Sequence, residues 1–270
     1  MTERGWALVT GAGGRIGRAL ALAAGEAGYD VIVHHRTSNL GADETVAAIE
    51  AMGRHARARA AELTDPEACR ALIEAAERPI TLLVNSASLF EDDAIETLTP
   101  DAWDAVMAVN ARAPLLLAQA FAAALPADRE GLIVNITDQR VWRLNPRFFS
   151  YTMAKAALWA ATQTLAQALA PRVRVNGVSP AAVVKGSTMF PRDRVRASLT
   201  KYNIPFDESL SDDELRDLLA GFYAERTLTR QPIDPSDCAE AILFLASPRT
   251  RCTTGHLIPV DGGLAEAILR

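Results

Sequence analysis

Short runs of apolar and β-branched residues alternate along the chain with longer segments rich in Ala and Leu. The short runs have the length of strands and the longer segments have helical apolar spacing, so the alternation predicts repeated strand–helix–strand units. Such units build an α/β fold with a doubly wound parallel sheet of about seven strands and helices on both faces. The expected strands are 6–10, 30–34, 56–62, 81–85, 131–137, 172–179 and 257–260. The expected helices are one beginning near Arg15, then 43–52, 66–77, 101–124, 150–170 and 235–246.

Composition favours one domain spanning 1–270 and restricts its partners. The 270 residues are 49% hydrophobic, which is enough to bury a large core without disulfides. The net charge is −5 and basic residues are scattered among acids, so nucleic acid is not an expected partner. No leader precedes Trp6, and no apolar run approaches the roughly 18 residues of a membrane span. We therefore expect no membrane partner.

The cysteines also limit the class of protein. Cys69, Cys238 and Cys252 are odd in number and widely spaced, without a CxxC pair or a matching His spacing. This pattern argues against a disulfide framework and against a zinc or other metal site. A reducing, cytoplasmic compartment fits it best.

A glycine-rich segment, Thr10-Gly11-Ala12-Gly13-Gly14-Arg15-Ile16-Gly17, lies between the first predicted strand and the first predicted helix. Glycines let the backbone turn tightly and approach a pyrophosphate, whose charge is met by N–H groups at the helix N-terminus. The alternative is a tight turn without a ligand. The strand before and the helix after favour a single-domain Rossmann fold that binds a dinucleotide. The expected cofactor contacts here are Gly11, Arg15, Ile16 and Gly17.

The end of the second predicted strand indicates which dinucleotide is bound. NAD-specific Rossmann proteins place an acidic residue here for the ribose, but this chain has His34-His35-Arg36-Thr37-Ser38. A guanidinium with two hydroxyls suits a 2′-phosphate, so we expect NADP(H) bound by Arg36, Thr37 and Ser38. Arg36 could instead be an ordinary solvated residue. Asp65, after the third strand, is either an adenine contact or the N-cap of the helix that starts at Pro66.

A tyrosine and a lysine lie four residues apart in Tyr151-Thr152-Met153-Ala154-Lys155, within a predicted helix. Residues at this spacing face the same side of a helix. A phenol titrates near pH 10, and a nearby ammonium favours its ionised form, which makes Tyr151 a usable acid or base at neutral pH. The spacing alone is common and could be incidental. With Asn110 and Asp138 upstream, it predicts a catalytic group.

Several landmarks run from Ala7 to Gly263. They are the glycine loop, Asn85-Ser86-Ala87-Ser88, Val109-Asn110-Ala111, the Tyr151/Lys155 pair, Arg174-Val175-Asn176-Gly177-Val178-Ser179-Pro180, and Val260-Asp261-Gly262-Gly263. With this set the chain resembles the short-chain dehydrogenase/reductase family. The resemblance implies that Tyr151 donates a proton, Lys155 lowers its pKa and holds the nicotinamide ribose, Asn110 supports a water linked to Lys155, and Asn85 lies at the cofactor. It also implies a homotetramer.

Three departures from the common family pattern resemble the pteridine reductase subgroup. Arg15 replaces the middle glycine of the loop, Ser88 replaces a glycine, and Asp138 replaces a catalytic serine thirteen residues before Tyr151. In that subgroup the arginine contacts cofactor phosphate and substrate, and the aspartate works with the tyrosine. Ser88 and Phe90 match the positions that hold the pterin, so the resemblance implies that Phe90 stacks on a flat ring against the nicotinamide. Ser86 departs from a second asparagine that is common among these relatives.

The chemistry of Asp138 favours a C=N substrate independently. An ionised carboxylate has no proton for a carbonyl oxygen, so it suits ketone reduction only if its pKa is raised. Imine reduction passes through a cationic nitrogen, which a carboxylate stabilises. The alternative is an exposed acid at a strand end without a catalytic role.

Residues 181–230 form a long, charged segment interrupted by Pro191 and Pro205, with a helix expected at 211–224. An insertion at this place usually covers the ligand crevice. Its pieces 184–187 and 222–227 resemble the dehydrogenase halves of bifunctional sugar-phosphate aldolase/dehydrogenases. The first hypothesis is therefore NADPH-dependent reduction of a small substrate, a dihydropterin or related cyclic imine. A sugar- or aldehyde-directed dehydrogenase is the second, and an NADP-sensing binding protein is a third, against which Asn110, Tyr151 and Lys155 argue.

Overall fold

The computed structural model describes residues 4–264 except 75, 145, 185–186 and 188–189. Its centre is a seven-stranded sheet in the order β3-β2-β1-β4-β5-β6-β7, and every neighbouring pair is parallel. This is a single-domain Rossmann-like α/β fold, as the sequence predicted. The strands are β1 (Trp6–Val9), β2 (Asp30–His35), β3 (Ala56–Ala60), β4 (Ile80–Asn85), β5 (Gly131–Ile136), β6 (Val173–Pro180) and β7 (Leu257–Val260).

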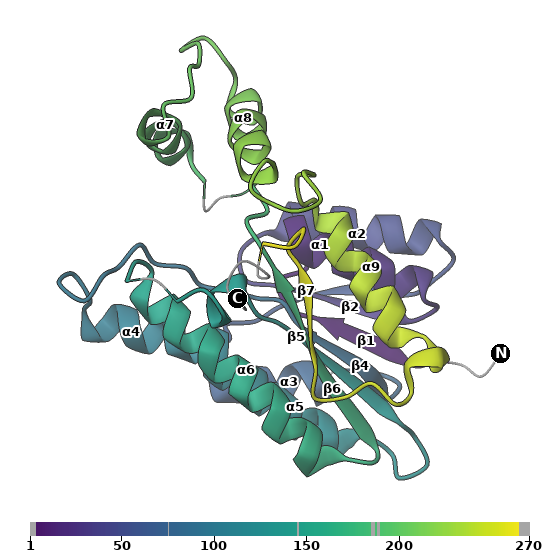
Figure 1. Ribbon diagram of the computed structural model, residues 1–270. Coiled ribbons are helices and arrows are strands. Elements are labelled where there is room, and N and C mark those ends of the chain that lie inside the picture. Colours follow the sequence, from purple (N-terminus) through teal and green to yellow (C-terminus); the bar gives the residue numbers. More distant parts are fainter. Residues whose placement is uncertain (1–3, 75, 145, 185–186, 188–189, 265–270) are drawn as a thin grey trace.

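Helices cover both faces of the sheet (Figure 1). They are α1 (Arg15–Glu26), α2 (Asn39–Ala51), α3 (Pro66–Glu74), α4 (Pro100–Met107), α5 (Ala113–Ala124), α6 (Phe149–Leu169), α7 (Arg192–Lys201), α8 (Asp212–Ala224) and α9 (Pro235–Ala246). One apolar core packs α1, α2 and α9 against the sheet, and a second packs α3, α5 and α6 against the opposite face. Because both faces are covered, β1, β2, β4 and β5 are buried along their whole length, which explains their continuous apolar runs.

The strand order reverses between β1 and β4, so the connections from these two strands leave in opposite directions. A crevice forms at such a switch point beside the carboxyl ends of parallel strands. Thr10 follows β1 and joins it to the segment after β4. Its Oγ1 accepts from the backbone N–H groups of Ser86 at 2.9 Å and Ala87 at 3.0 Å. The glycine loop after β1 and the segment after β4 therefore lie side by side.

The helix predicted for 101–124 is instead two helices, α4 and α5, joined by a π-helical turn at Ala108–Arg112. Asn110 lies in this turn, and its Nδ2 donates to the carbonyl oxygens of Val106 at 3.0 Å and Leu89 at 2.7 Å. The side chain takes a carbonyl of the preceding turn, which accounts for the local widening of the helix. The remaining predicted boundaries differ by a few residues at element ends.

Residues 181–230 contain one helix that the sequence did not predict. The expected helix is α8, and its N-terminus has a capping box between Ser211 and Glu214. The additional helix is α7. Its sequence is strongly charged, and its two buried residues, Val195 and Leu199, are too few to give a clear apolar periodicity. These pack against Leu215 and Leu219 of α8 in a small core of their own. In Figure 1, α7 and α8 stand apart from the sheet and its covering helices; we call this unit the lobe.

Three further findings bear on the class of protein. Among the described residues, one stretch, Pro100–Ala124, is long and apolar enough to cross a membrane, but 56% of its most apolar 18-residue window is buried, and it supplies core residues such as Leu117 and Phe121. Within 4–264, gaps aside, no three His, Cys, Asp or Glu side chains gather as metal ligands. Cys69 and Cys238 are buried as free thiols, and Cys252 is exposed.

Candidate functional site

Tyr151 and Lys155 lie one turn apart on α6 and face the end of β5. The Tyr151 hydroxyl donates to Oδ2 of Asp138 at 3.1 Å. Lys155 Nζ donates to the carbonyl oxygen of Ile136 at 2.8 Å and lies 5.5 Å from the centre of the Tyr151 ring. Tyr151 is 5% exposed and Lys155 2%. The fold thus brings the pair predicted from its spacing against the carboxyl group that follows β5.

Burial decides the protonation of these groups. It raises the pKa of Asp138, although the Arg140 N–H and the charges of Arg140 and Lys155 oppose this. Burial, followed by the carboxylate of Asp138, raises the pKa of Tyr151 well above its usual value, and burial lowers the pKa of Lys155 to about 8. The expectation that Lys155 lowers the pKa of Tyr151 is therefore not met in the chain alone. The ammonium is turned to Ile136, while the hydroxyl faces a carboxyl group.

Asn110 and Ser88 join the π-helical turn to the segment after β4. Ser88 Oγ donates to Oδ1 of Asn110 at 2.7 Å, and Nδ2 of the same amide donates to the Leu89 carbonyl. Asn110 is completely buried. It therefore holds the backbone that leads directly into Phe90.

Asn85 ends β4 and is oriented by a buried amide chain. Its Nδ2 donates to Oδ1 of Asn135 at 2.8 Å, and Asn135 donates to Thr162 Oγ1 of α6 at 2.9 Å. The Asn85 Oδ1 atom is buried without a donor from the described residues. An unpaired buried acceptor at a strand end suits a bound molecule, which supports the predicted role of Asn85.

Phe90 lies at the centre of an aromatic group beside the catalytic pair. Its ring centre is 4.9 Å from that of Tyr151, in an edge-to-face arrangement, and 4.5 Å from that of Phe148. These rings give the site a flat apolar wall next to the Tyr151 hydroxyl. Ser88, Phe90 and Tyr151, the three predicted substrate contacts, are brought together.

The glycine loop fits a pyrophosphate. Gly11 has φ of +69°, and a Cβ there would lie 2.9 Å from Cα of Ala87; a Cβ on Gly17 would collide with the Gly11 carbonyl oxygen. Helix α1 begins after Gly14 with no side-chain cap and no acidic residue in its first turn. Its N–H groups and dipole are therefore available to an anion, as the sequence predicted for this loop.

Arg15 departs from glycine at a position where the backbone favours glycine. Its φ is +50°, in the left-handed region. The side chain runs toward the segment that leads into the lobe, since Nη2 donates to the Val183 carbonyl oxygen at 3.0 Å. Its Nε is buried, and no described residue offers it an acceptor. Burial lowers the pKa of Arg15 and the nearby Tyr151 opposes the shift, so the guanidinium lies within electrostatic reach of the catalytic pair. Strain at this point is consistent with a functional side chain.

The predicted contacts for the 2′-phosphate are exposed beside the loop. Among the described residues, Arg36 is held by Glu62 alone, at 3.9 Å between Nη1 and Oε2, and both side chains are about half exposed. Ser38 Oγ donates to the Gly13 carbonyl oxygen at 3.1 Å, which places Arg36, Thr37 and Ser38 at the glycine loop. Asp65 accepts from the Glu67 N–H at 2.9 Å, so it has the N-cap role that was one of its two alternatives.

Sequence reasoning missed Arg140, Phe148 and the ion pair between Arg194 and Asp92. Arg140 lies two residues after Asp138, and its guanidinium is 4.6 Å from the centre of the Phe148 ring. Arg194, on α7, contacts Asp92 at 2.6 Å and lies over the Phe90 and Phe148 rings. The Arg and aromatic residues of 138–149 were the only local pattern that could have indicated these contacts. The Arg194–Asp92 pair joins residues that are distant in sequence, so no local pattern predicts it.

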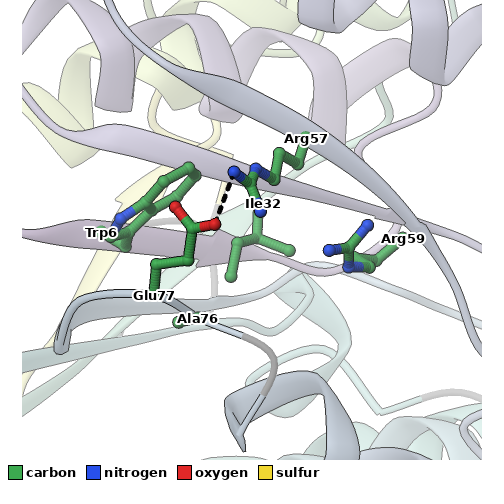
Figure 2. A pocket seen from close by; sticks show the side chains of 6 residues that line it. All are labelled: Trp6, Ile32, Arg57, Arg59, Ala76 and Glu77. Atoms are coloured by element: carbon green, nitrogen blue, oxygen red, sulfur yellow. Dashed lines mark ion pairs between the residues drawn. The ribbon is translucent and has the colours of Figure 1, made fainter.

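A separate hollow lies over β1, β2 and β3 (Figure 2). It is lined by Trp6, Ile32, Arg57, Arg59, Ala76 and Glu77. Arg57 and Glu77 form an ion pair across it at 2.8 Å. Its lining includes none of the predicted catalytic, cofactor or substrate residues.

Family models cover nearly the whole chain. A short chain dehydrogenase model matches residues 5–194, and an enoyl-(acyl carrier protein) reductase model matches residues 208–265. The chain belongs to the short-chain dehydrogenase/reductase family. It is therefore an oxidoreductase by family, and the landmarks that indicated this resemblance are confirmed as a set.

Several relatives align over almost their full length. An uncharacterized oxidoreductase of Methylorubrum extorquens is 34% identical, with 96% of each chain covered. The 3-oxoacyl-(acyl-carrier-protein) reductase FabG of Staphylococcus aureus is 29% identical over 96% of this chain and 97% of its own. FolM alternative dihydrofolate reductase 1 from Brucella suis, solved with NADP, has a TM-score of 0.81 at 33% identity, with 98% and 97% covered. The angucycline C-6 ketoreductase LanV, also solved with NADP, has a TM-score of 0.80 at 31% identity, with 97% and 95% covered.

Proposed function

We propose that this protein is an NADPH-dependent reductase that transfers hydride to a C=N bond of a dihydropterin or a related cyclic imine. The observation that carries the proposal is the hydrogen bond between the Tyr151 hydroxyl and the Asp138 carboxyl group, which replaces the usual serine. FolM from Brucella suis, a dihydrofolate reductase by name, is among the similar structures and supports the same substrate class.

The residues present fit NADPH. The uncapped α1 terminus and the glycine loop suit the pyrophosphate, and Arg36 with Thr37 and Ser38 suits the 2′-phosphate. Lys155 Nζ is buried at the carboxyl edge of β5, where it would hold the nicotinamide ribose. NADPH, when bound, supplies the hydride. The relatives solved with NADP support this choice of cofactor.

Reduction of C=N adds a hydride to carbon and a proton to nitrogen, and the side chains here manage the proton. Asp138 is partly buried, with its side chain 19% exposed, and desolvation raises its pKa, so it can give a proton to a ring nitrogen and then stabilise the cation as a carboxylate. Tyr151, whose pKa is raised by burial and then by Asp138, stays neutral and is the second proton source. Ser88 and Phe90 are placed to receive a flat ring, and Arg15 lies beside it.

A carbonyl substrate is the second candidate, and the raised pKa of Asp138 favours it. A protonated carboxyl group can donate to a carbonyl oxygen as a serine hydroxyl does. The similarity to LanV, a ketoreductase by name, also supports a carbonyl substrate. Sugar or aldehyde substrates belong to this candidate. A binding protein without turnover is less well supported, because Asn110, Tyr151 and Lys155 are all in place.

The two candidates are separated by a substrate screen combined with Asp138→Ser. NADPH oxidation is followed with dihydropterins, ketones, aldehydes and sugars. We expect dihydropterin turnover in the wild type, and in Asp138→Ser a loss of roughly 10-fold or more while any carbonyl turnover is unchanged or improved, because serine restores a neutral donor.

Tyr151→Phe is the matched control for proton donation. It should keep NADPH affinity and lose about 100-fold or more in turnover, as expected when a general acid is removed from a formed site. Absence of pterin turnover in the wild type, together with carbonyl turnover that is kept in Asp138→Ser, would make the carbonyl candidate the better one.

A further inference from the structure

Arg140 has a buried donor that nothing in the described protein satisfies. It lies in the short 3-10 helix Gln139–Val141, directly after Asp138, and its side chain is 18% exposed. Its Nη1 atom is buried without a hydrogen-bond partner among the described residues. Buried guanidinium N–H groups are normally paired, because an unpaired one costs roughly 1–3 kcal/mol. Such an atom in a ligand crevice suits an acceptor from outside the chain.

The contacts that Arg140 does make leave this donor free. Its Nε is 4.0 Å from Oδ1 of Asp138, which is too long for a hydrogen bond. Asp138 Oδ1 is instead taken by the Arg140 backbone N–H at 2.9 Å. The guanidinium lies over the Phe148 ring at 4.6 Å, and contact with a ring face leaves the in-plane N–H groups unpaired.

The position of Arg140 is next to the reacting groups. The rings of Phe148, Phe90 and Tyr151 form a continuous chain with centre distances of 4.5 Å and 4.9 Å, and Arg140 lies at its Phe148 end. The charge of Arg140 also acts on Asp138 and Tyr151. Arg194 of α7 lies over the same Phe148 ring, at 5.5 Å. Arg140 therefore lies beside Asp138 and shares the Phe148 ring with a residue of the lobe.

We propose that Arg140 is a specificity-determining residue that binds an oxygen acceptor of the substrate, a ring carbonyl or a carboxylate, through Nη1. This inference rests on the proposed function and names the part of the substrate that is recognised beyond the reduced bond. A pterin ring has such an oxygen at its 4-position, whereas a 2,4-diaminopteridine has an amino group there. Arg140 thus selects oxo rings, because a donor facing an amino group remains unpaired.

Direct binding to the enzyme saturated with NADP⁺ tests the proposal. The probes are pterin, 2,4-diaminopteridine and folate, which adds carboxylates to the pterin ring, and the variants are Arg140→Met and Arg147→Met. Arg147 is the matched control, because its guanidinium also lies over Phe148, at 5.3 Å, but is 60% exposed and pairs with Asp92.

In Arg140→Met we expect Kd for pterin to rise 10-fold or more and Kd for 2,4-diaminopteridine to change less than 3-fold, with NADP⁺ affinity unchanged. If the acceptor is a carboxylate, Kd for folate rises and Kd for pterin does not, which also supports the proposal. Arg147→Met should change none of these values more than 3-fold.

Two results would overturn the inference in different ways. If the wild type binds pterin and Arg140→Met binds all three probes as tightly, or loses all three equally, Arg140 does not recognise an oxygen and the proposed function stands. If the wild type binds none of the probes, the proposed function fails together with this inference.

Discussion

At the scale of single residues, cofactor choice depends on one exposed guanidinium. Arg36 forms a long, exposed ion pair with Glu62, at 3.9 Å, so it can turn to a 2′-phosphate at little cost. Arg36→Ala should weaken NADPH binding by about 1.5–3 kcal/mol, the value of a hydrogen bond to a charged group, and should spare NADH. Fluorescence titration of both cofactors measures the two affinities.

Arg18→Ala is the control for Arg36→Ala, because Arg18 pairs with Glu44 at 3.0 Å on the outer side of α1. It should leave both affinities unchanged. Equal losses of NADPH and NADH affinity in Arg36→Ala would contradict the assignment.

At the scale of elements, His34 ties the glycine loop to the sheet. Its Nδ1 accepts from the Gly11 N–H at 3.0 Å, and its Nε2 lies 3.2 Å from the Ala61 carbonyl oxygen. This arrangement requires the neutral ring with hydrogen on Nε2. Burial lowers the pKa of His34 to about 4 from 6.5. The folded state therefore resists a proton that the unfolded chain accepts, and stability is lost as pH falls from 6.5 toward 4.

Urea unfolding should show this loss. Between pH 7.5 and 5, His34 should contribute about 2 kcal/mol of destabilisation in the wild type, and His34→Gln should show a correspondingly shallower pH dependence. His55→Gln, at an exposed histidine, should keep the wild-type pH dependence. If His34→Gln and the wild type lose stability in parallel as the pH falls, neutral His34 does not hold the glycine loop to the sheet.

At the scale of the whole molecule, the lobe and the rest of the described protein, which we call the body, have separate apolar cores. Leu199 is completely buried within the lobe cluster, and Arg194 joins the lobe to Asp92. Leu199→Ala removes about 2–5 kcal/mol of packing from a core that is much smaller than those of the body. Hydrogen exchange of α7 and α8 should increase while that of β1 and β4 stays unchanged. Substrate KM should rise several-fold, with NADPH affinity kept.

The comparison for Leu199→Ala is Leu8→Ala, which opens a cavity in the core of the body. It should lower the midpoint of global unfolding, whereas Leu199→Ala should leave that midpoint nearly unchanged. Equal shifts of the midpoint would mean that the lobe and the body unfold as one cooperative unit.

Local patterns in the sequence determined the strands, most of the helices, the glycine loop and the pairing of Tyr151 with Lys155. Each of these depends on residues a few positions apart, through periodicity, turn chemistry and helical spacing, so no long-range contact is needed to predict them. The helix α7 was missed because charged residues hid its two buried positions, Val195 and Leu199.

Only the tertiary structure decided which groups of the site face one another and how deeply they are buried. The direction of the Tyr151 pKa depends on which group faces the hydroxyl and how deeply both are buried, and the unpaired donor of Arg140 depends on which neighbours enclose it. The contact of Arg194 with Asp92 joins residues 102 positions apart. Burial and hydrogen-bond pairing are properties of the assembled chain, because desolvation and partner geometry arise only when distant segments exclude water together.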